Sequence, residues 1–264
     1  MFIDTHAHLD SDKFAHDLPG VLARAAEAGV TTVIAVGCDV ASSRRCVELA
    51  EAWPNVHATV GIHPCYVSET GGENWQEEIF RLAQHPRVVA IGEIGLDYFH
   101  APPSGTSWEE YKALQAEVFL RQMQMASALG KNIVVHQRNS FADCTDMVAH
   151  FSGQLRAQFH CFVNPWTDAL PLVEQGHLIS FTGIATYPKA PEVLECARQA
   201  SAGRFMLETD SPYLSPLPVR GRRCEPAHLR HTAEAIARAQ GVSLETLARE
   251  TSAAAREFFG LPTE

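Results

Sequence analysis

The stretch Phe2-Ile3-Asp4-Thr5-His6-Ala7-His8 decides how the chain is interpreted, because an apolar start runs directly into two histidines. Phe2 and Ile3 predict a first β-strand, in which alternate side chains point to the same side. We therefore expect His6 and His8 to lie side by side. Two neutral imidazoles in this arrangement form half of a site for a divalent cation. On its own, a His-x-His pair also fits a solvated strand edge.

Short apolar runs rich in β-branched residues alternate with segments of helical periodicity along the whole chain. This alternation is typical of βα units on a parallel sheet. The predicted strands cover residues 2–6, 31–36, 57–60, 88–92, 132–136, 157–162, 178–182 and 204–208. The predicted helices cover residues 18–28, 42–52, 75–83, 108–129, 141–151, 165–175, 191–201, 226–239 and 244–259. Because nothing resembles a linker or a repeat, we expect one α/β domain over residues 1–264. A (β/α)8 barrel (TIM barrel) is the predicted fold, and an open doubly wound sheet is the alternative.

The composition predicts an ordinary globular protein, since 46% of the 264 residues are hydrophobic and 20% are charged. The sequence contains no secretory signal and no apolar run of membrane-spanning length, so we expect a cytoplasmic protein without a membrane partner. Its seven scattered cysteines include no Cys-x-x-Cys pair, which favours reduced thiols.

A formal net charge of −10 argues against a protein that coats nucleic acid through bulk electrostatics. A polyanionic substrate would have to be attracted locally, by metal ions or by the cluster Arg220, Arg222 and Arg223. The cluster is equally compatible with a solvated loop.

Side chains of metal-ligand type follow the predicted strands at the end where barrel enzymes place their functional groups. They are His6, His8, Glu93, His136, His160 and Asp210. His63, in the turn Gly61-Ile62-His63-Pro64, favours a substrate contact. Structural roles are expected for the histidines elsewhere, which are His16, His57, His85, His100, His150, His177, His228 and His231.

Glu93 lies in Gly92-Glu93-Ile94-Gly95-Leu96-Asp97, where the glycines are expected to let the backbone pass closely beneath a ligand. A buried glutamate needs a cation or an arginine to compensate its charge. Because a carboxylate has two oxygens, Glu93 is the candidate for bridging two metal ions. A salt-bridged core acid is the alternative.

Asp210 follows the last predicted strand, where a carboxylate could hold a metal ion and act as general base toward the attacking water. Two cations about 3.5 to 4 Å apart form a clamp for in-line attack on a phosphodiester. Arg138 could offer its forked guanidinium to a phosphate oxygen. Glu208, two residues before Asp210, is a weaker candidate for supporting a metal ligand.

Six motifs in chain order resemble the TatD family of metal-dependent deoxyribonucleases, which belongs to the amidohydrolase superfamily. They are Asp4-Thr5-His6-Ala7-His8-Leu9-Asp10, Gly61-Ile62-His63-Pro64, Gly92-Glu93-Ile94-Gly95-Leu96-Asp97, His136-Gln137-Arg138, His160-Cys161-Phe162 and Glu208-Thr209-Asp210-Ser211-Pro212-Tyr213. A seventh segment, Gly221-Arg222-Arg223-Cys224-Glu225-Pro226, resembles a family loop. The resemblance spans nearly the whole chain. The chain departs from the family at Val163-Asn164, where Ser-Gly is usual, and at Cys224, where asparagine is usual.

The resemblance implies a TIM-barrel hydrolase with two divalent metal ions, magnesium, manganese or zinc, and 3′ to 5′ exonuclease activity on DNA. RNA and abasic sites are further substrates of the family. By matching motif, one ion is held by His6, His8, Glu93 and Asp210, and the other by Glu93, His136 and His160. Glu93 and Asp210 would be catalytic, while His63, Arg138 and Arg222 would contact the substrate. DNA ends are then the expected partner, and a monomer is compatible with this.

Two other functions stay open at this point. The same metal-activated water can attack the carbonyl of a small ester, lactone or amide, and the negative net charge mildly favours this. A catalytically silent nucleic-acid-binding or scaffold protein is the third possibility, against which the intact carboxylates argue.

Overall fold

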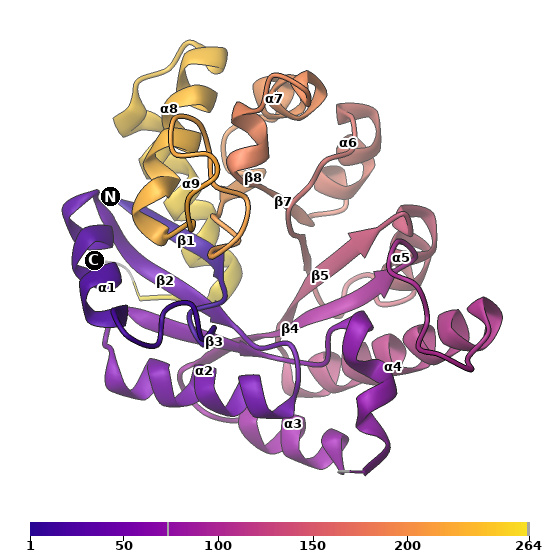
Figure 1. Ribbon diagram of the computed structural model, residues 1–264. Coiled ribbons are helices and arrows are strands. Elements are labelled where there is room, and N and C mark those ends of the chain that lie inside the picture. Colours follow the sequence, from indigo (N-terminus) through magenta and orange to yellow (C-terminus); the bar gives the residue numbers. More distant parts are fainter. Residues whose placement is uncertain (73, 263–264) are drawn as a thin grey trace.

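The chain forms a (β/α)8 barrel in the computed structural model, which describes residues 1–72 and 74–262 (Figure 1). Within that part, eight parallel strands pair in chain order. They are β1 (Phe2–Ala7), β2 (Val30–Val36), β3 (Val56–Val60), β4 (Val88–Asp97), β5 (Asn132–Arg138), β6 (Ala157–Phe159), β7 (Leu178–Phe181) and β8 (Phe205–Leu207). The predicted barrel is confirmed, and the open doubly wound sheet is not formed.

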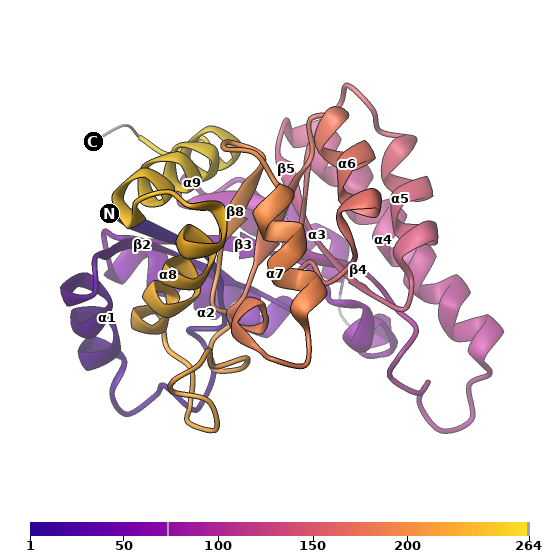
Figure 2. The same cartoon turned by 90° about the horizontal axis from the view of Figure 1, so that it is seen from above.

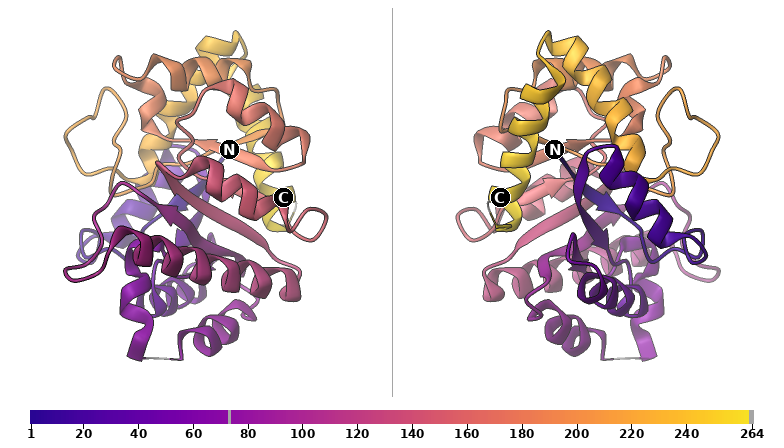
Figure 3. Two further views of the ribbon diagram at one scale, coloured as in Figure 1. Left: turned by 90° about the vertical axis from the view of Figure 1, so that its right-hand side faces the viewer. Right: turned by 90° about the vertical axis from the view of Figure 1, so that its left-hand side faces the viewer.

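Helices follow the strands and cover the outside of the sheet, except α9, which follows α8 and packs against the amino end of the barrel (Figures 1 and 3). They are α1 (Leu18–Glu27), α2 (Val40–Ala52), α3 (Trp75–Ala83), α4 (Trp108–Leu129), α5 (Phe141–Ala149), α6 (Trp166–Glu174), α7 (Pro191–Gln199), α8 (Leu229–Gln240) and α9 (Leu244–Phe259). Local signals fix several starts, because Asp39, Ser107 and Ser243 accept backbone N–H groups at the first turns of α2, α4 and α9. No helix of the described chain is both long and apolar enough to cross a membrane.

The boundaries differ from the predictions at a few places. β4 continues to Asp97, well past the predicted end at residue 92, while β6 and β8 are only three residues long. The predicted helix 226–239 starts instead as a 3-10 turn over Pro226–His228 before α8 begins. Two further 3-10 segments, Pro64–Gly72 and Gly183–Thr186, follow β3 and β7.

The barrel closes where β1 meets the chain just beyond β8. Ala7 forms a parallel bridge with Ser211, and the backbone N–H of Asp210 donates to the carbonyl of His6 at 2.9 Å. Asp4, which is fully buried, accepts hydrogen bonds from the backbone N–H and the hydroxyl of Thr209 at 2.9 and 2.6 Å. We call this junction of 4–8 with 208–211 the seam. It brings the first and last functional segments of the chain together.

The inside of the barrel changes character along its axis. At the amino end, apolar strand residues pack against the apolar face of α9; the cluster is Ile3, Ile34, Val36, Ala90, Val134, Leu178, Met206, Ala254, Ala255, Phe258, Phe259 and Leu261. Nearer the carboxyl end, the Gln158 amide donates hydrogen bonds to Thr5, Ser180 and Glu208. Figure 2 shows α9 and the loop after β8, in orange, on opposite sides of the barrel. Because α9 covers the amino end of the barrel, a functional site is expected at the carboxyl end.

Candidate metal centre

Glu93 reaches the axis because β4 runs very close to β5. A Cβ atom added at Gly92 would lie 2.6 Å from the Cβ of Val134, and one added at Gly95 would overlap the carbonyl oxygen of His136. Gly95 also has φ +142°, which side-chain-bearing residues rarely adopt. Both glycines therefore serve the packing of β4 against β5, and the expected passage of the backbone beneath a ligand stays a prediction. They allow two strands to approach, and the register shift between Ile91 and Ile94 accompanies this approach.

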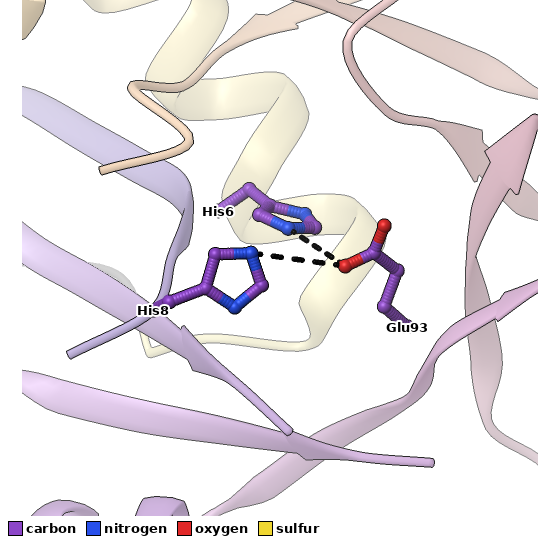
Figure 4. Close-up of side chains that lie close together, drawn as sticks. All are labelled: His6, His8 and Glu93. Atoms are coloured by element: carbon purple, nitrogen blue, oxygen red, sulfur yellow. Dashed lines mark ion pairs between the residues drawn. The ribbon is translucent and has the colours of Figure 1, made fainter. Parts of the chain in front are cut away.

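One oxygen of Glu93 faces His6 in β1 and His8 just after it (Figure 4). Its Oε2 lies 3.3 Å from Nε2 of His6 and 3.8 Å from Nε2 of His8. Asp210 completes this side, since its Oδ1 lies 3.2 Å from His8 Nε2 and 3.8 Å from His6 Nε2. Two imidazoles and two carboxylates thus converge at the carboxyl end of the barrel, as predicted from the sequence.

The other oxygen of Glu93 faces His136 in β5 and His160 just after β6. Its Oε1 lies 2.8 Å from Nδ1 of His136 and 2.8 Å from Nε2 of His160. His63, which follows β3, places Nε2 3.5 Å from the same oxygen. The four histidines among the predicted metal ligands, together with His63, therefore surround the carboxylate of Glu93 and are divided between its two oxygens, and Asp210 lies beside His6 and His8.

Glu93 is a buried carboxylate that is surrounded by imidazoles. Glu93 is 3% exposed, and every ion-pair partner that the described chain gives it is an imidazole rather than arginine or lysine. Burial raises the pKa of its carboxyl, but His160 and the other histidines outweigh burial and hold the pKa well below its usual range. His6 is completely buried, and neither of its ring nitrogens has a hydrogen-bond partner among the described residues. Imidazole nitrogens and carboxylate oxygens in this arrangement fit divalent metal ions.

Carboxylates behind the two histidines of β5 and β6 hold the rings in place. Asp97 at the end of β4 lies 2.9 Å from Nε2 of His136. Glu208, which is fully buried, lies 3.4 Å from Nδ1 of His160 and accepts the backbone N–H of Cys161 at 2.6 Å. The suggestion that Glu208 supports a ligand agrees with this contact, whereas the role of Asp97 was missed. The sequence carried no signal for it, because the contact depends on the extension of β4 from the predicted end at residue 92 to Asp97.

Cys38 is a further neighbour that the sequence did not single out. It follows β2, and its Sγ lies 3.7 Å from both Nδ1 of His8 and Oε2 of Glu93. Its position after a strand was the only signal in the sequence. A cysteine without a second cysteine nearby did not indicate a metal site.

The arginines expected to contact the substrate differ in their exposure and in their partners. Arg138 ends β5 and is exposed, with its guanidinium 3.7 Å from the centroid of the Phe99 ring. Arg222 is exposed in the loop after β8. The expectation that the neighbouring arginines face a substrate is wrong for Arg223, which binds Asp17 at 2.7 Å and the carbonyl of Lys13. Arg220 lies 4.2 Å from the centroid of the Tyr187 ring.

His100, for which the sequence predicted only a structural role, lies beside the centre. His100 has Nδ1 2.9 Å from Oδ2 of Asp97, because the chain after β4 folds back over its own end. His57 and His177 do lie away from the centre, in β3 and next to β7.

The two departures from the family pattern have ordinary structural explanations. Asn164 accepts the amide of Gln137 at 3.2 Å and donates to Asp168 at 2.9 Å, while Val163 is 41% exposed. Cys224 is completely buried beneath the loop after β8.

A (β/α)8 barrel with histidines and carboxylates at the carboxyl ends of its strands defines the class of metal-dependent hydrolases. Residues 3–260 match the family model described as TatD related DNase, so the chain belongs to the TatD family.

Relatives and a solved structure agree with this membership. The chain is 34% identical to "Uncharacterized metal-dependent hydrolase YcfH" of Escherichia coli (strain K12), over 95% of this chain and 92% of the relative. It is 32% identical to "3'-5' ssDNA/RNA exonuclease TatD" of Erwinia tasmaniensis, over 98% and 99% of the two chains. The crystal structure of the Escherichia coli TatD homologue YjjV matches the fold with a TM-score of 0.90, at 24% identity, over 99% of this chain and 98% of that one.

Proposed function

We propose that this metal-dependent hydrolase is a 3′ to 5′ exonuclease that removes nucleotides from single-stranded DNA ends, with RNA ends as further substrates. The division of ligands between the two oxygens of Glu93 carries the proposal, because it fits two cations on either side of one carboxylate. The name of the Erwinia relative supports the choice of substrate. Action at abasic sites of DNA belongs to the same proposal.

Two divalent ions, magnesium, manganese or zinc, complete the site in this proposal. His6, His8, Asp210 and Glu93 would hold one ion, and Glu93, His136 and His160 would hold the other. Bound ions supply Lewis-acid activation of water and neutralise charge that develops on the phosphate. The protein contributes the fixed positions of these side chains, which Asp97 and Glu208 secure from behind.

Asp210 is the proposed general base. Burial raises the pKa of its carboxyl, but the hydrogen bond and charge of His8 outweigh burial and lower it, so the group is ionised at neutral pH. It lies in the left-handed region, with φ +56°, directly after the strand end. From there its free lone pairs can accept the proton of the attacking water while Glu93 remains between the two sets of histidines.

His63 is proposed to donate a hydrogen bond to the phosphate. Its Nδ1 accepts the backbone N–H of Cys65 at 3.0 Å, so a neutral ring carries its proton on Nε2, which faces the centre. Burial and the neighbouring His136 lower the pKa of His63 to about 3, which keeps the ring neutral. Arg138 and Arg222 would meet the phosphates further along the strand, and their exposure leaves them free to do so.

The test compares substrates of different chemistry on metal-stripped protein that is reloaded with magnesium, manganese or zinc in turn. Single-stranded DNA and RNA oligonucleotides, labelled at the 5′ end, should shorten stepwise from the 3′ end and release mononucleotides. A phosphorothioate at the 3′ end should stop the reaction, and chelator should abolish it.

Two results would contradict the proposal. Hydrolysis of small esters or lactones with intact oligonucleotides would assign the centre to carbonyl chemistry. Tight oligonucleotide binding without chelator-sensitive hydrolysis would assign the protein to the silent nucleic-acid-binding class.

A further inference from the structure

A second cluster of ligand-type side chains lies next to the centre but outside its ligand set. It consists of Cys65 at the start of the 3-10 segment after β3, Asp97 at the end of β4 and His100 in the following loop. One ligand atom from each lies within 4.8 Å of the others. None of the three was given a role by the sequence motifs that define the centre.

The carboxylate of this cluster is fixed before any ligand binds. Oδ1 of Asp97 accepts the backbone N–H groups of Phe99 and His100 at 2.9 and 2.8 Å. These bonds turn Oδ2 toward His100 Nδ1, at 2.9 Å, and toward His136 Nε2, also at 2.9 Å. Because Asp97 is completely buried, its orientation cannot relax into solvent.

The sulfur and the imidazole are spaced as two ligands of one tetrahedral ion. Cys65 Sγ lies 3.6 Å from His100 Nδ1. Typical zinc bonds to sulfur and nitrogen, at a tetrahedral angle, place these two ligand atoms about 3.5 Å apart. The His100 to Asp97 distance is shorter than that spacing, and His100, with half of its side chain exposed, is free to turn and open it.

We propose that Cys65, Asp97 and His100 bind an additional divalent cation of the zinc type, with water in the fourth position. A sulfur, an imidazole and a carboxylate suit zinc, cobalt or cadmium, whereas magnesium requires oxygen ligands. On binding, the Cys65 thiol releases its proton to solvent and the thiolate forms the bond to the cation.

This cation would act on the centre through Asp97. Oδ2 of Asp97 would contact the ion and His136 together, so the position of the His136 ring would depend on whether the site is filled. It would also add positive charge beside Arg138 and Phe99, at the side of the barrel where a polyanion approaches a chain of net charge −10. The binding itself does not depend on which substrate the enzyme hydrolyses.

Cobalt substitution tests the proposal with readouts other than activity. Metal-stripped protein is titrated with cobalt(II), while the thiolate-to-cobalt charge-transfer band in the near ultraviolet is recorded and the bound metal is counted. We expect the wild-type chain to show the band and to bind one equivalent more than Cys65→Ser. His100→Gln should lose the same equivalent.

Cys38→Ser provides the matched control, because the Cys38 thiol also lies close to metal-ligand side chains. We expect this variant to keep the band. A band that disappears in Cys38→Ser and persists in Cys65→Ser would overturn the proposal, as would equal metal counts in wild type and Cys65→Ser. In those cases the Asp97 to His100 contact is only a hydrogen bond within a turn. A failed exonuclease assay leaves the difference of one equivalent unaffected, so the two proposals can fail separately.

Discussion

The two ends of the barrel use the same strands for opposite purposes. At the amino end, strand residues such as Ile3 and Met206 interlock with Phe258 of α9 in an apolar cluster. At the carboxyl end, His6 and Glu93 are equally buried but are surrounded by polar groups, and both nitrogens of His6 lack hydrogen-bond partners among the described residues. Burying apolar groups stabilises a fold, whereas burying unpaired polar groups costs free energy. The difference indicates that the amino end stabilises the barrel, whereas the carboxyl end depends on that stability to keep its polar groups buried.

The largest effect is expected from Glu93→Gln at the carboxyl end. The amide keeps the size of the side chain but removes the charge that both sets of histidines face, so hydrolysis should fall by at least about 10³-fold. Steady-state kinetics on the reloaded enzyme measures this loss, and circular dichroism checks that the barrel remains folded. Glu174→Gln, on the exposed surface of α6, is the matched control and should retain full activity.

At the amino end, Phe258→Ala should affect stability instead of chemistry. Phe258 is 2% exposed, and its removal leaves a cavity beneath the strands, which costs about 3 to 5 kcal/mol in free energy of unfolding. Urea denaturation measures the cost, and kcat at a temperature where the variant is folded should match wild type. Phe80→Ala on α3, where the ring is 41% exposed, should cost far less. Equal costs for both variants would contradict the contrast between the two ends.

Glu208→Gln probes the layer between the two ends. Losing the charge behind His160 should weaken metal binding by about 10- to 100-fold while the hydrogen bonds to Ser180 and Gln158 can largely be replaced by the amide. Isothermal titration of metal-stripped protein measures this change. A variant with unchanged metal affinity would show that the 3.4 Å contact has no part in holding the ring.

The smallest effect is expected from pH at the amino end. Burial, together with the charge of Arg87, lowers the pKa of His57 to about 4 in the folded protein, below its usual value near 6.5. The unfolded chain therefore takes up the proton first, and stability present above pH 6.5 is lost as the pH falls toward 4. Between pH 7 and 5 the loss due to this residue should be about 1 to 2 kcal/mol. Urea denaturation at both pH values should show a correspondingly smaller drop for His57→Gln.

Regular alternation and side-chain type were sufficient to predict the barrel and the residues around Glu93. Both depend on local patterns, since a strand and its following residue can be recognised without knowing the partner strand. The extension of β4 could not be predicted, because it depends on how closely Gly92 and Gly95 let β5 approach. Asp97 and His100 were missed for the same reason. The longer strand places Asp97 where it contacts both His136 and His100.

Arg223 illustrates the opposite error, because an arginine cluster that suggested substrate binding contains a residue with a structural role. Its guanidinium binds Asp17 and so ties the loop after β8 to the loop after β1. Sequence distance between the partners concealed this contact, since 206 positions separate them.

The seam has a consequence for synthesis of the protein. Asp210 and the chain beside it pair with residues 4–8, so a nascent polypeptide holds His6 and His8 without Asp210 until that residue has been synthesised. A product that ends prematurely before that position has both an open sheet edge and an unfinished centre. Translation errors of this kind therefore yield a chain that exposes an unpaired strand and lacks the complete metal centre.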